Sequence, residues 1–564
     1  MSQSFARVVF AFTAVFFAAF FLWPVLQILK GGFINADGDL TFAYLSALLS
    51  DPTYLAGLRN SFLLACAATT LAMLIALPLA FISDRFIFPA KGLLGSIVLI
   101  PMILPPFVGA IGLKQIFGQY GALNALLHHL HLLAPETTID WFALHPFWGI
   151  AIVEALSLYP IIYLNTLAAL ANIDPAMEEA AQNLGCTGLR RFRKITLPLI
   201  RPGLFAGGTI VFIWAFTELG TPLIFDYDKV TSVQIYYGLK DIGGNPFPYT
   251  LVAVMLFSSV ALYAIGKGLF GRTGHAMMAK ATSSGGPRAL PGAGRWLCTA
   301  LFGGVTFLAV LPHIGVILVA FSSDWYGTLI PHDYTLENIT LALGHDLTVP
   351  AIANSLRFAA FSTVIDIVLG IAIGYVIVRS KIAGRQLLDF LAMLPLAVPG
   401  LVLAFGYLAM SQDGKFFSFL NPTRDPTILL IIAYSVRRLP YVVRAAVAGF
   451  QQTSETLEEA AQNLGCPPLK AVAKITLPLI AANLIAGGLL AFAFAMLEVS
   501  DSLILAQKQA YYPITKAILE LFQLLGDGKF IASALGVWAM AFLGITIAGL
   551  SIVLGKKLGA IFRV

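Results

Sequence analysis

Charged side chains are scarce in this sequence. They make up 11% of its 564 residues, whereas soluble globular proteins carry about 25%. Hydrophobic residues make up 58% of the chain. This composition excludes an ordinary soluble domain and predicts a polytopic membrane protein. The net charge of +6 does not indicate nucleic-acid binding, because the basic residues lie in short loops between apolar runs.

Cysteines and phosphate-binding motifs are also lacking. The four cysteines are too scattered for a disulfide framework or a zinc knuckle, so we predict no metal site and no cofactor. None of the Gly-Lys pairs is followed by the Ser or Thr of a G-x-x-x-x-G-K-[ST] loop. We therefore predict that the chain is not an enzyme and that any ATP hydrolysis belongs to a partner.

Apolar runs of about 20 residues, long enough to cross a bilayer, recur along the whole chain. We place them near 7–29, 61–83, 93–117, 148–170, 202–224, 250–270, 297–321, 352–378, 386–410, 427–449, 482–505 and 532–555. The pattern predicts an all-α polytopic membrane protein with about 12 transmembrane helices.

Lys and Arg gather in alternate loops. They include Arg85, Lys91, Arg190, Arg191, Arg193, Lys194, Arg379, Lys381, Arg385, Lys556, Lys557 and Arg563. Because positive charge is retained on the cytoplasmic side, we predict that both termini are cytoplasmic. The segment 271–295 has basic residues, no acid and a Ser-Ser-Gly-Gly-Pro stretch, which favours a cytoplasmic linker.

One nine-residue segment, EEAAQNLGC, occurs at 178–186 and again at 458–466, 280 residues later. Both copies follow the pattern E-A-A, three residues, G, nine residues, I-x-L-P. The first four positions are Glu179, Ala180, Ala181 and Gly185 in one copy and Glu459, Ala460, Ala461 and Gly465 in the other. We therefore predict two pseudo-symmetric six-helix units, at 1–270 and 296–564.

Each copy reads as a short helix followed by a sharp turn. Asp174 and Ser454 are suited to cap the helix N-terminus, and a glycine ends it in a left-handed conformation. A second short helix is expected at 189–197 and 469–477, before the next span. We define the two polar loops as 174–200 and 454–480.

Charges inside the predicted spans are candidates for the path through the membrane. Glu218 and Glu498 are 280 residues apart, so pseudo-symmetry would place them at equivalent sites. They line the path or only bond backbone at a helix break. Arg437 and Arg438 have no counterpart in the first half. They either attract an anionic solute or pair with Glu or backbone.

Three histidines, His128, His129 and His131, lie in the predicted external loop 118–147. A metal site there would need further ligands, and the nearest acids, Glu136 and Asp140, lie beyond Pro135. We favour solvated histidines on an amphipathic external helix.

The repeated loop resembles the EAA loop of type I binding-protein-dependent ABC importer permeases, with two permease units fused in one chain. The resemblance implies that each loop forms a coupling helix that docks on a cytoplasmic ATPase dimer. Glu179 and Glu459 would meet a basic residue of the ATPase, and Gly185 and Gly465 would make the bend.

The resemblance also implies a bacterial plasma (inner) membrane location and a periplasmic or lipid-anchored binding protein as partner. Fused permeases of this size look most like those for ferric iron, which is the expected solute. Phosphonates such as 2-aminoethylphosphonate, sugar phosphates, thiamine and polyamines remain alternatives.

Two other classes are weighed against this interpretation. An ion-driven secondary transporter also has repeated halves, but it needs no pair of cytoplasmic docking helices. A membrane enzyme is disfavoured because no His, Asp and Glu cluster has catalytic spacing in the sequence.

Overall fold

The computed structural model describes residues 3–35, 37–134, 136–241, 244–270, 288–290 and 292–554. Within them the protein is almost entirely helical, with two short strand pairs. This confirms the predicted fold class. The predicted linker lies mostly outside the described residues, and the unit boundaries at 270 and 296 stay predictions.

The first half contains fifteen α-helices among its described residues. They are α1 (Gln3–Phe17), α2 (Trp23–Phe33), α3 (Ala43–Ser50), α4 (Pro52–Arg85), α5 (Lys91–Ile97), α6 (Pro106–Phe117), α7 (Ala122–His129), α8 (Trp141–Leu144), α9 (Pro146–Ala171), α10 (Pro175–Asn183), α11 (Gly188–Arg191), α12 (Leu197–Thr217), α13 (Gly220–Ile224), α14 (Thr231–Gly238) and α15 (Phe247–Phe270).

The second half contains twelve α-helices among its described residues. They are α16 (Ala293–Ala320), α17 (Glu337–Gly344), α18 (Thr348–Arg379), α19 (Arg385–Met393), α20 (Gly400–Met410), α21 (Thr427–Gln452), α22 (Glu455–Asn463), α23 (Pro468–Ala471), α24 (Leu477–Met496), α25 (Ser500–Leu505), α26 (Ile514–Phe522) and α27 (Gly528–Leu554).

Short turns and strands complete the described chain. The π-turns are η1 (Ala18–Leu22), η3 (Phe192–Thr196) and η7 (Val472–Thr476), and the 3₁₀ turns are η2 (Ile100–Ile103), η4 (Leu239–Asp241), η5 (Leu394–Ala397), η6 (Ser418–Leu420) and η8 (Gln509–Tyr511). Strand β1 (Phe86–Ile87) pairs in parallel with β2 (Arg288–Ala289), and β3 (Ser322–Asp324) pairs antiparallel with β4 (Asp333–Tyr334).

Nine helices in the described residues are long and apolar enough to cross a membrane, and eleven spans result if two bent pairs each count as one. The twelfth predicted span, 427–449, forms α21, which has 26 residues. Every 18-residue window of α21 contains Arg437, Arg438 and Arg444, so α21 is less apolar than the others. All twelve predicted segments therefore lie on helical structure.

The two bent pairs are related by the repeat. The chain bends by 98° between η2 and α6 and by 100° between η5 and α20. Pro101 and Pro105 lie at the first bend, and Pro395 and Pro399 lie at the second. A proline removes a backbone donor and cannot continue a helix without distortion, which explains why both spans break there.

Two predicted spans are not continuous helices. The segment 202–224 breaks at Glu218, between α12 and α13, and the segment 482–505 breaks around Glu498, between α24 and α25. The second short helix after each motif is likewise corrected, because α11 runs through η3 into α12 as one span at Gly188–Thr217. The same continuity holds for α23, η7 and α24.

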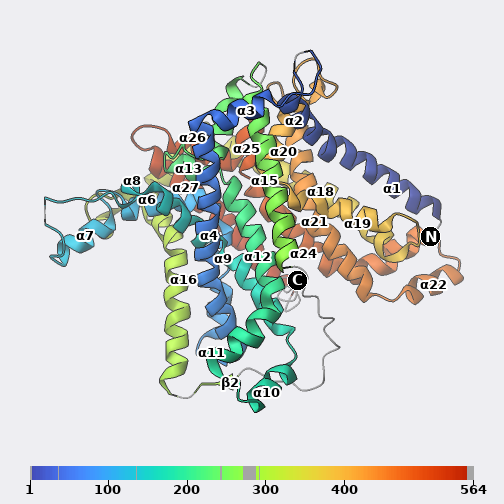
Figure 1. Cartoon of the computed structure of the whole chain (residues 1–564), viewed down its shortest axis with the longest axis horizontal. Helices are drawn as coiled ribbons and strands as arrows, with labels where there is room; N and C mark the ends of the chain where they lie inside the picture. The colour runs from blue at the N-terminus through green and yellow to red at the C-terminus, as the bar shows by residue number, and fades with distance from the viewer. Residues whose placement is uncertain are drawn as a thin grey trace.

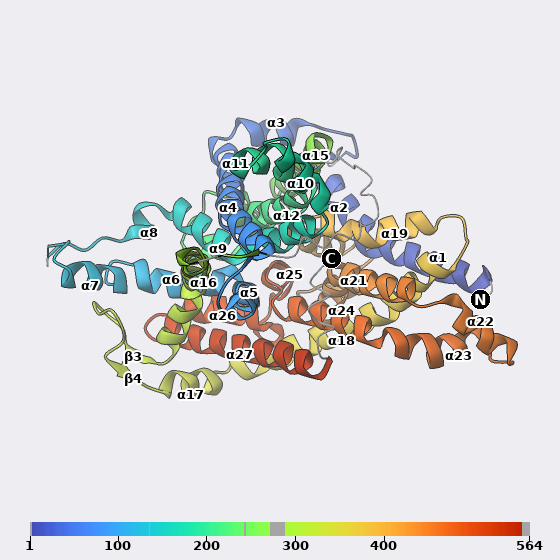
Figure 2. The same cartoon turned by 90° about the horizontal axis from the view of Figure 1, so that it is seen from below.

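The helices form two bundles that spread apart toward the ends carrying α10 and α22 (Figure 1). Seen from below, α10 lies over the first bundle and α22 lies at the far end of the second (Figure 2). The first helix of each half packs on the other half, since α2 contacts α20 and α16 contacts α6. The two halves therefore form one interlocked body.

Matching glycines permit these exchanged contacts. A Cβ on Gly112 of α6 would lie 2.3 Å from the carbonyl oxygen of Pro312 in α16. A Cβ on Gly406 of α20 would lie 2.8 Å from the Cβ of Pro24 in α2. Small residues allow helix backbones to approach closely in a membrane, so each glycine holds the other half's first span against a broken span.

Candidate functional site: two polar loops and a central cavity

The helices α10 and α22, called the motif helices below, have the predicted ends. The Asp174 side chain accepts a hydrogen bond from the Ala176 N–H at 2.9 Å, and the Ser454 hydroxyl accepts one from the Thr456 N–H at 3.3 Å. Gly185 and Gly465 have φ of 78° and 86°, and they end the helices as predicted. Bonds of 2.8 and 3.0 Å from Cys186 N to Ala181 O and from Cys466 N to Ala461 O close the turns.

The predicted contact residues divide by exposure. Glu179, Ala180, Gly185 and their equivalents Glu459, Ala460 and Gly465 are exposed, whereas Ala181 is buried and Ala461 is half-buried. Leu184 and Leu464, which the sequence reasoning missed, are 88% and 90% exposed. Exposed apolar side chains beside exposed acids are typical of a surface that a partner covers.

The first glutamate of each repeated segment was not singled out from sequence, yet it is buried. Glu178 is 5% exposed and Glu458 is 4% exposed. Each lies one residue from an exposed glutamate, so the two acids of each motif helix have different surroundings. A sequence signal existed, because the acid was duplicated in both copies.

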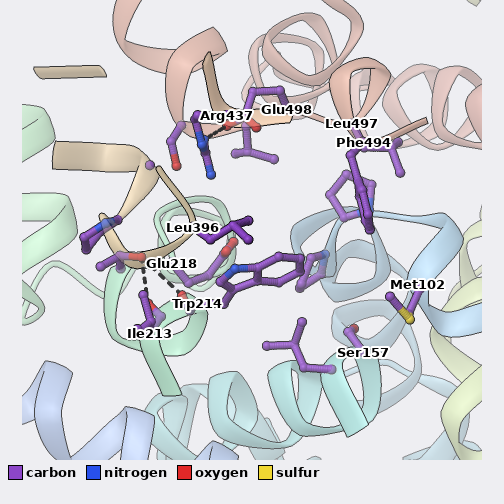
Figure 3. A pocket seen from close by; sticks show the side chains of 18 of the residues that line it. Met102, Ser157, Ile213, Trp214, Glu218, Leu396, Arg437, Phe494, Leu497 and Glu498 are labelled. Carbon is purple, nitrogen blue, oxygen red and sulfur yellow. Dashed lines mark hydrogen bonds and ion pairs between the residues drawn. The ribbon is translucent and has the colours of Figure 1, made fainter. Parts of the chain in front are cut away.

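A central cavity lies between the halves, lined by matching positions (Figure 3). The matched pairs, 280 or 294 residues apart, are Pro101 and Pro395, Met102 and Leu396, Pro105 and Pro399, Ser157 and Arg437, Leu158 and Arg438, Trp214 and Phe494, Thr217 and Leu497, and Glu218 and Glu498. The structure therefore brings together all four predicted path residues around one cavity.

Aromatic side chains meet across the cavity. The rings of Trp214 and Phe494 contact edge to face, with centroids 6.3 Å apart. These two residues occupy matching positions, so their contact lies where the two halves meet. Trp214 crosses the middle of the cavity in Figure 3, while Arg437 and Glu498 lie together on another wall.

The two arginines are held by acids from the same half. Arg437 and Arg438 both bond the Glu498 carboxylate. Arg437 also lies 3.4 Å from an oxygen of Asp501, which is fully buried. Of the two alternatives for the arginine pair, the geometry favours internal pairing. Asp501 was missed in the sequence although it lies in a predicted span.

Glu218 has different surroundings. Its carboxylate accepts hydrogen bonds from the Thr221 N–H at 3.2 Å and from the Thr221 hydroxyl at 3.3 Å. No Lys or Arg within the described ranges forms an ion pair with it. The reason is local sequence, since Ser157 and Leu158 stand where the second half has its arginines.

Glu154 of α9 is a second acid that sequence reasoning missed. It is fully buried, and neither carboxylate oxygen has a hydrogen-bond partner among the described residues. It lies one helical turn from Ser157, which lines the cavity, and Glu218 is its charged neighbour. The same search for intramembrane acids that found Glu218 would have found it.

Hydrogen bonds position both glutamate-bearing breaks alike. The Ser232 hydroxyl donates to the Glu218 carbonyl oxygen, and the Thr515 hydroxyl donates to the Glu498 carbonyl oxygen, each at 2.6 Å. The segments that follow are tied to α4 and α18, because Ser61 accepts from the Thr231 N–H at 2.9 Å and Ser355 accepts from the Ile514 N–H at 2.7 Å. The predicted match of Asn60-Ser61 with Asn354-Ser355 is therefore structural.

The histidine-bearing loop extends from α6 as an arm that includes α7 and α8 (Figure 1). The ring Nε2 of His128 lies 2.9 Å from the Thr137 carbonyl oxygen. In the described ranges, no group of three or more His, Cys, Asp or Glu is arranged to hold a metal ion.

The chain belongs to the family described as binding-protein-dependent transport system inner membrane component, whose pattern matches residues 72–273 and 366–554. The match occurs once in each half and covers more than half of the chain. The protein is therefore a multi-pass inner membrane permease of an ABC importer, and the ion-driven alternative is excluded.

Several curated proteins are similar to the chain. A putative ferric transport system permease protein of Haemophilus influenzae is 27% identical over 85% of this chain and 75% of its own length. A ferric transport system permease protein of Actinobacillus pleuropneumoniae is 26% identical over 85% of this chain and 69% of its own. A putative 2-aminoethylphosphonate transport system permease protein of Salmonella typhimurium is 25% identical over 46% of this chain and 90% of its own.

One solved structure is a bacterial ABC transporter involved in the import of the acidic polysaccharide alginate. It aligns with 17% identity and a TM-score of 0.35, covering 46% of this chain and 95% of the other.

Proposed function

We propose that this permease carries ferric iron inward, driven by a cytoplasmic ATPase dimer that docks on both motif helices and supplied by an external binding protein. The proposal for the partners is supported by the two motif helices, which present matching exposed surfaces. The chain supplies the path, and the ATPase supplies the hydrolysis.

The observation that carries the choice of solute is the internal pairing of Arg437 and Arg438. Because Glu498 and Asp501 already bond these side chains, the arginine pair is a poor site for an anionic phosphonate or sugar phosphate. Glu218 presents carboxylate oxygens without a basic partner among the described residues. Oxygen ligands suit hard cations, and both ferric permease relatives align over most of the chain.

We expect uptake of ferric iron by proteoliposomes that contain this chain, its ATPase and its binding protein. Ferric iron loaded on the binding protein is the test solute, and 2-aminoethylphosphonate and sulfate are the controls. Uptake should require ATP inside the coupling compartment and should be lost with a hydrolysis-deficient ATPase. Uptake of an anion with no uptake of ferric iron would contradict the choice of solute but leave the transporter class intact.

The proposed orientation predicts that residue 284, in the linker, is reached only from the cytoplasm. A Ser284→Cys variant without the native cysteines should resist an impermeant thiol reagent in intact cells and react after the membrane is opened. The physical reason is the retention of Lys and Arg on the cytoplasmic side. Labelling in intact cells would reverse the orientation and place the motif helices outside.

A further inference from the structure

We propose that Glu178 and Glu458 are positioning residues that fasten each motif helix to the first turns of the next span. In this view, movement of a motif helix is passed directly to the helix that ends at the central cavity. The inference rests on the proposed docking of an ATPase on the motif helices and assigns how that movement reaches the path.

The fastening in the first half joins three elements at one carboxylate. The Thr196 hydroxyl at the end of η3 donates to Glu178 Oε1 at 2.7 Å. Arg85, the last residue of α4, donates to Glu178 Oε1 at 2.7 Å and lies 2.7 Å from Oε2. A bidentate, buried pair of this kind has a strong orientational preference. Motif helix, span two and span five are therefore held together at Glu178.

The second half repeats the arrangement with looser geometry. The Thr476 hydroxyl at the end of η7 donates to Glu458 Oε1 at 2.7 Å. Arg379, the last residue of α18, lies 3.6 Å from the same oxygen, and the Tyr375 hydroxyl donates to Oε2 at 3.3 Å. Arg379 also donates to the Thr453 carbonyl oxygen at 2.7 Å. The Thr–Glu contact is thus common to both copies, whereas the arginine contact is not equally tight.

A π-turn stands at the same place in both copies. It covers Phe192–Thr196 in one half and Val472–Thr476 in the other, and each ends on the threonine that bonds the glutamate. π-turns are rare inside helices and frequent at functional sites. The recurrence gives a second observation, independent of the hydrogen bonds, that this junction is a specialised part of the span.

The helices that follow connect each junction with the cavity. α12 has 21 residues and ends at Glu218, and α24 has 20 residues and ends just before Glu498. At about 1.5 Å per residue each helix is about 30 Å long. A displacement applied at Thr196 or Thr476 therefore moves a single helix whose other end lies beside the cavity.

The decisive variants remove the threonine hydroxyl and keep the side-chain shape. Thr196→Val and Thr476→Val should leave insertion and ATPase copurification unchanged. Uptake per ATP hydrolysed should fall by about fivefold in the double variant, which is the change expected when one buried hydrogen bond is lost. Thr196→Ser with Thr476→Ser keeps both hydroxyls and should retain normal uptake per ATP, which a loss of packing alone would not predict.

The two copies allow an internal comparison. Because Arg85 grips Glu178 more tightly than Arg379 grips Glu458, Glu178→Gln should lower uptake per ATP more than Glu458→Gln. Normal uptake per ATP in the double valine variant would overturn the proposal. If Glu179→Lys with Glu459→Lys also leaves ATPase copurification intact, the docking itself fails, so the two failures are distinguishable.

Discussion

Glu498→Gln is expected to destabilise the folded protein by about 3–5 kcal/mol, whereas Glu218→Gln should leave its stability nearly unchanged. Glu498 is 4% exposed and bonds both Arg437 and Arg438, so its neutralisation leaves buried positive charge uncompensated. Glu218 has no such partner among the described residues. Thermal unfolding of the purified protein in detergent should show a large drop in midpoint for the first variant only.

The same pair of variants separates stability from transport. Glu218→Gln is expected to lower ferric iron uptake about tenfold, which corresponds to about 1.4 kcal/mol in the barrier. Its hydrolytic activity with the ATPase should remain, because the change lies far from the motif helices. Normal uptake by Glu218→Gln would assign this carboxylate to capping α13 alone.

The chain offers a matched control for the charge cluster. Arg437→Ser, Arg438→Leu and Asp501→Thr together give the second half the residues that the first half has at Ser157, Leu158 and Thr221. Removing a whole buried ion cluster is often neutral or stabilising, so this triple variant should be more stable than Glu498→Gln. Equal losses of stability in Glu218→Gln and Glu498→Gln would contradict the assigned pairing.

Charge reversal on both motif helices, Glu179→Lys with Glu459→Lys, is expected to abolish transport while the protein still inserts. Both side chains are exposed, and an exposed ion pair contributes about 0–1 kcal/mol, so reversal is a stronger probe than neutralisation. The measurements are copurification of the ATPase and uptake in proteoliposomes. Wild-type uptake with both glutamates reversed would remove them from the docking surface.

Two further comparisons sharpen this experiment. The flanks differ, with Arg190-Arg191-Phe192-Arg193 in one copy and Lys470-Ala471-Val472-Ala473 in the other, so the single reversals should differ in severity. Leu184→Ala with Leu464→Ala tests the apolar part of the surface. Full burial of a leucine contributes about 1.5–3 kcal/mol, so this uncharged double variant should also weaken the ATPase complex.

Local patterns account for what was predictable. The length of the apolar runs predicted spans, and the capping residues Asp174 and Ser454 and the turn glycines predicted the ends of the motif helices. The repeat predicted that Glu218 and Glu498 would lie at matching sites of one cavity, as they do. The continuous form of spans five and eleven was wrong, because hydropathy averages over a short break.

Taken alone, the sequence determined the class, the repeat and the ends of the motif helices, since each depends on neighbours within a few turns. Only the tertiary structure decided which charges are available. Arg437 and Arg438 are occupied by Glu498, Glu178 is turned inward while Glu179 is exposed, and Glu154 is buried without a partner among the described residues. The electrostatic role of a buried charge depends on the groups within a few ångströms of it, and folding brings those groups from distant parts of the chain.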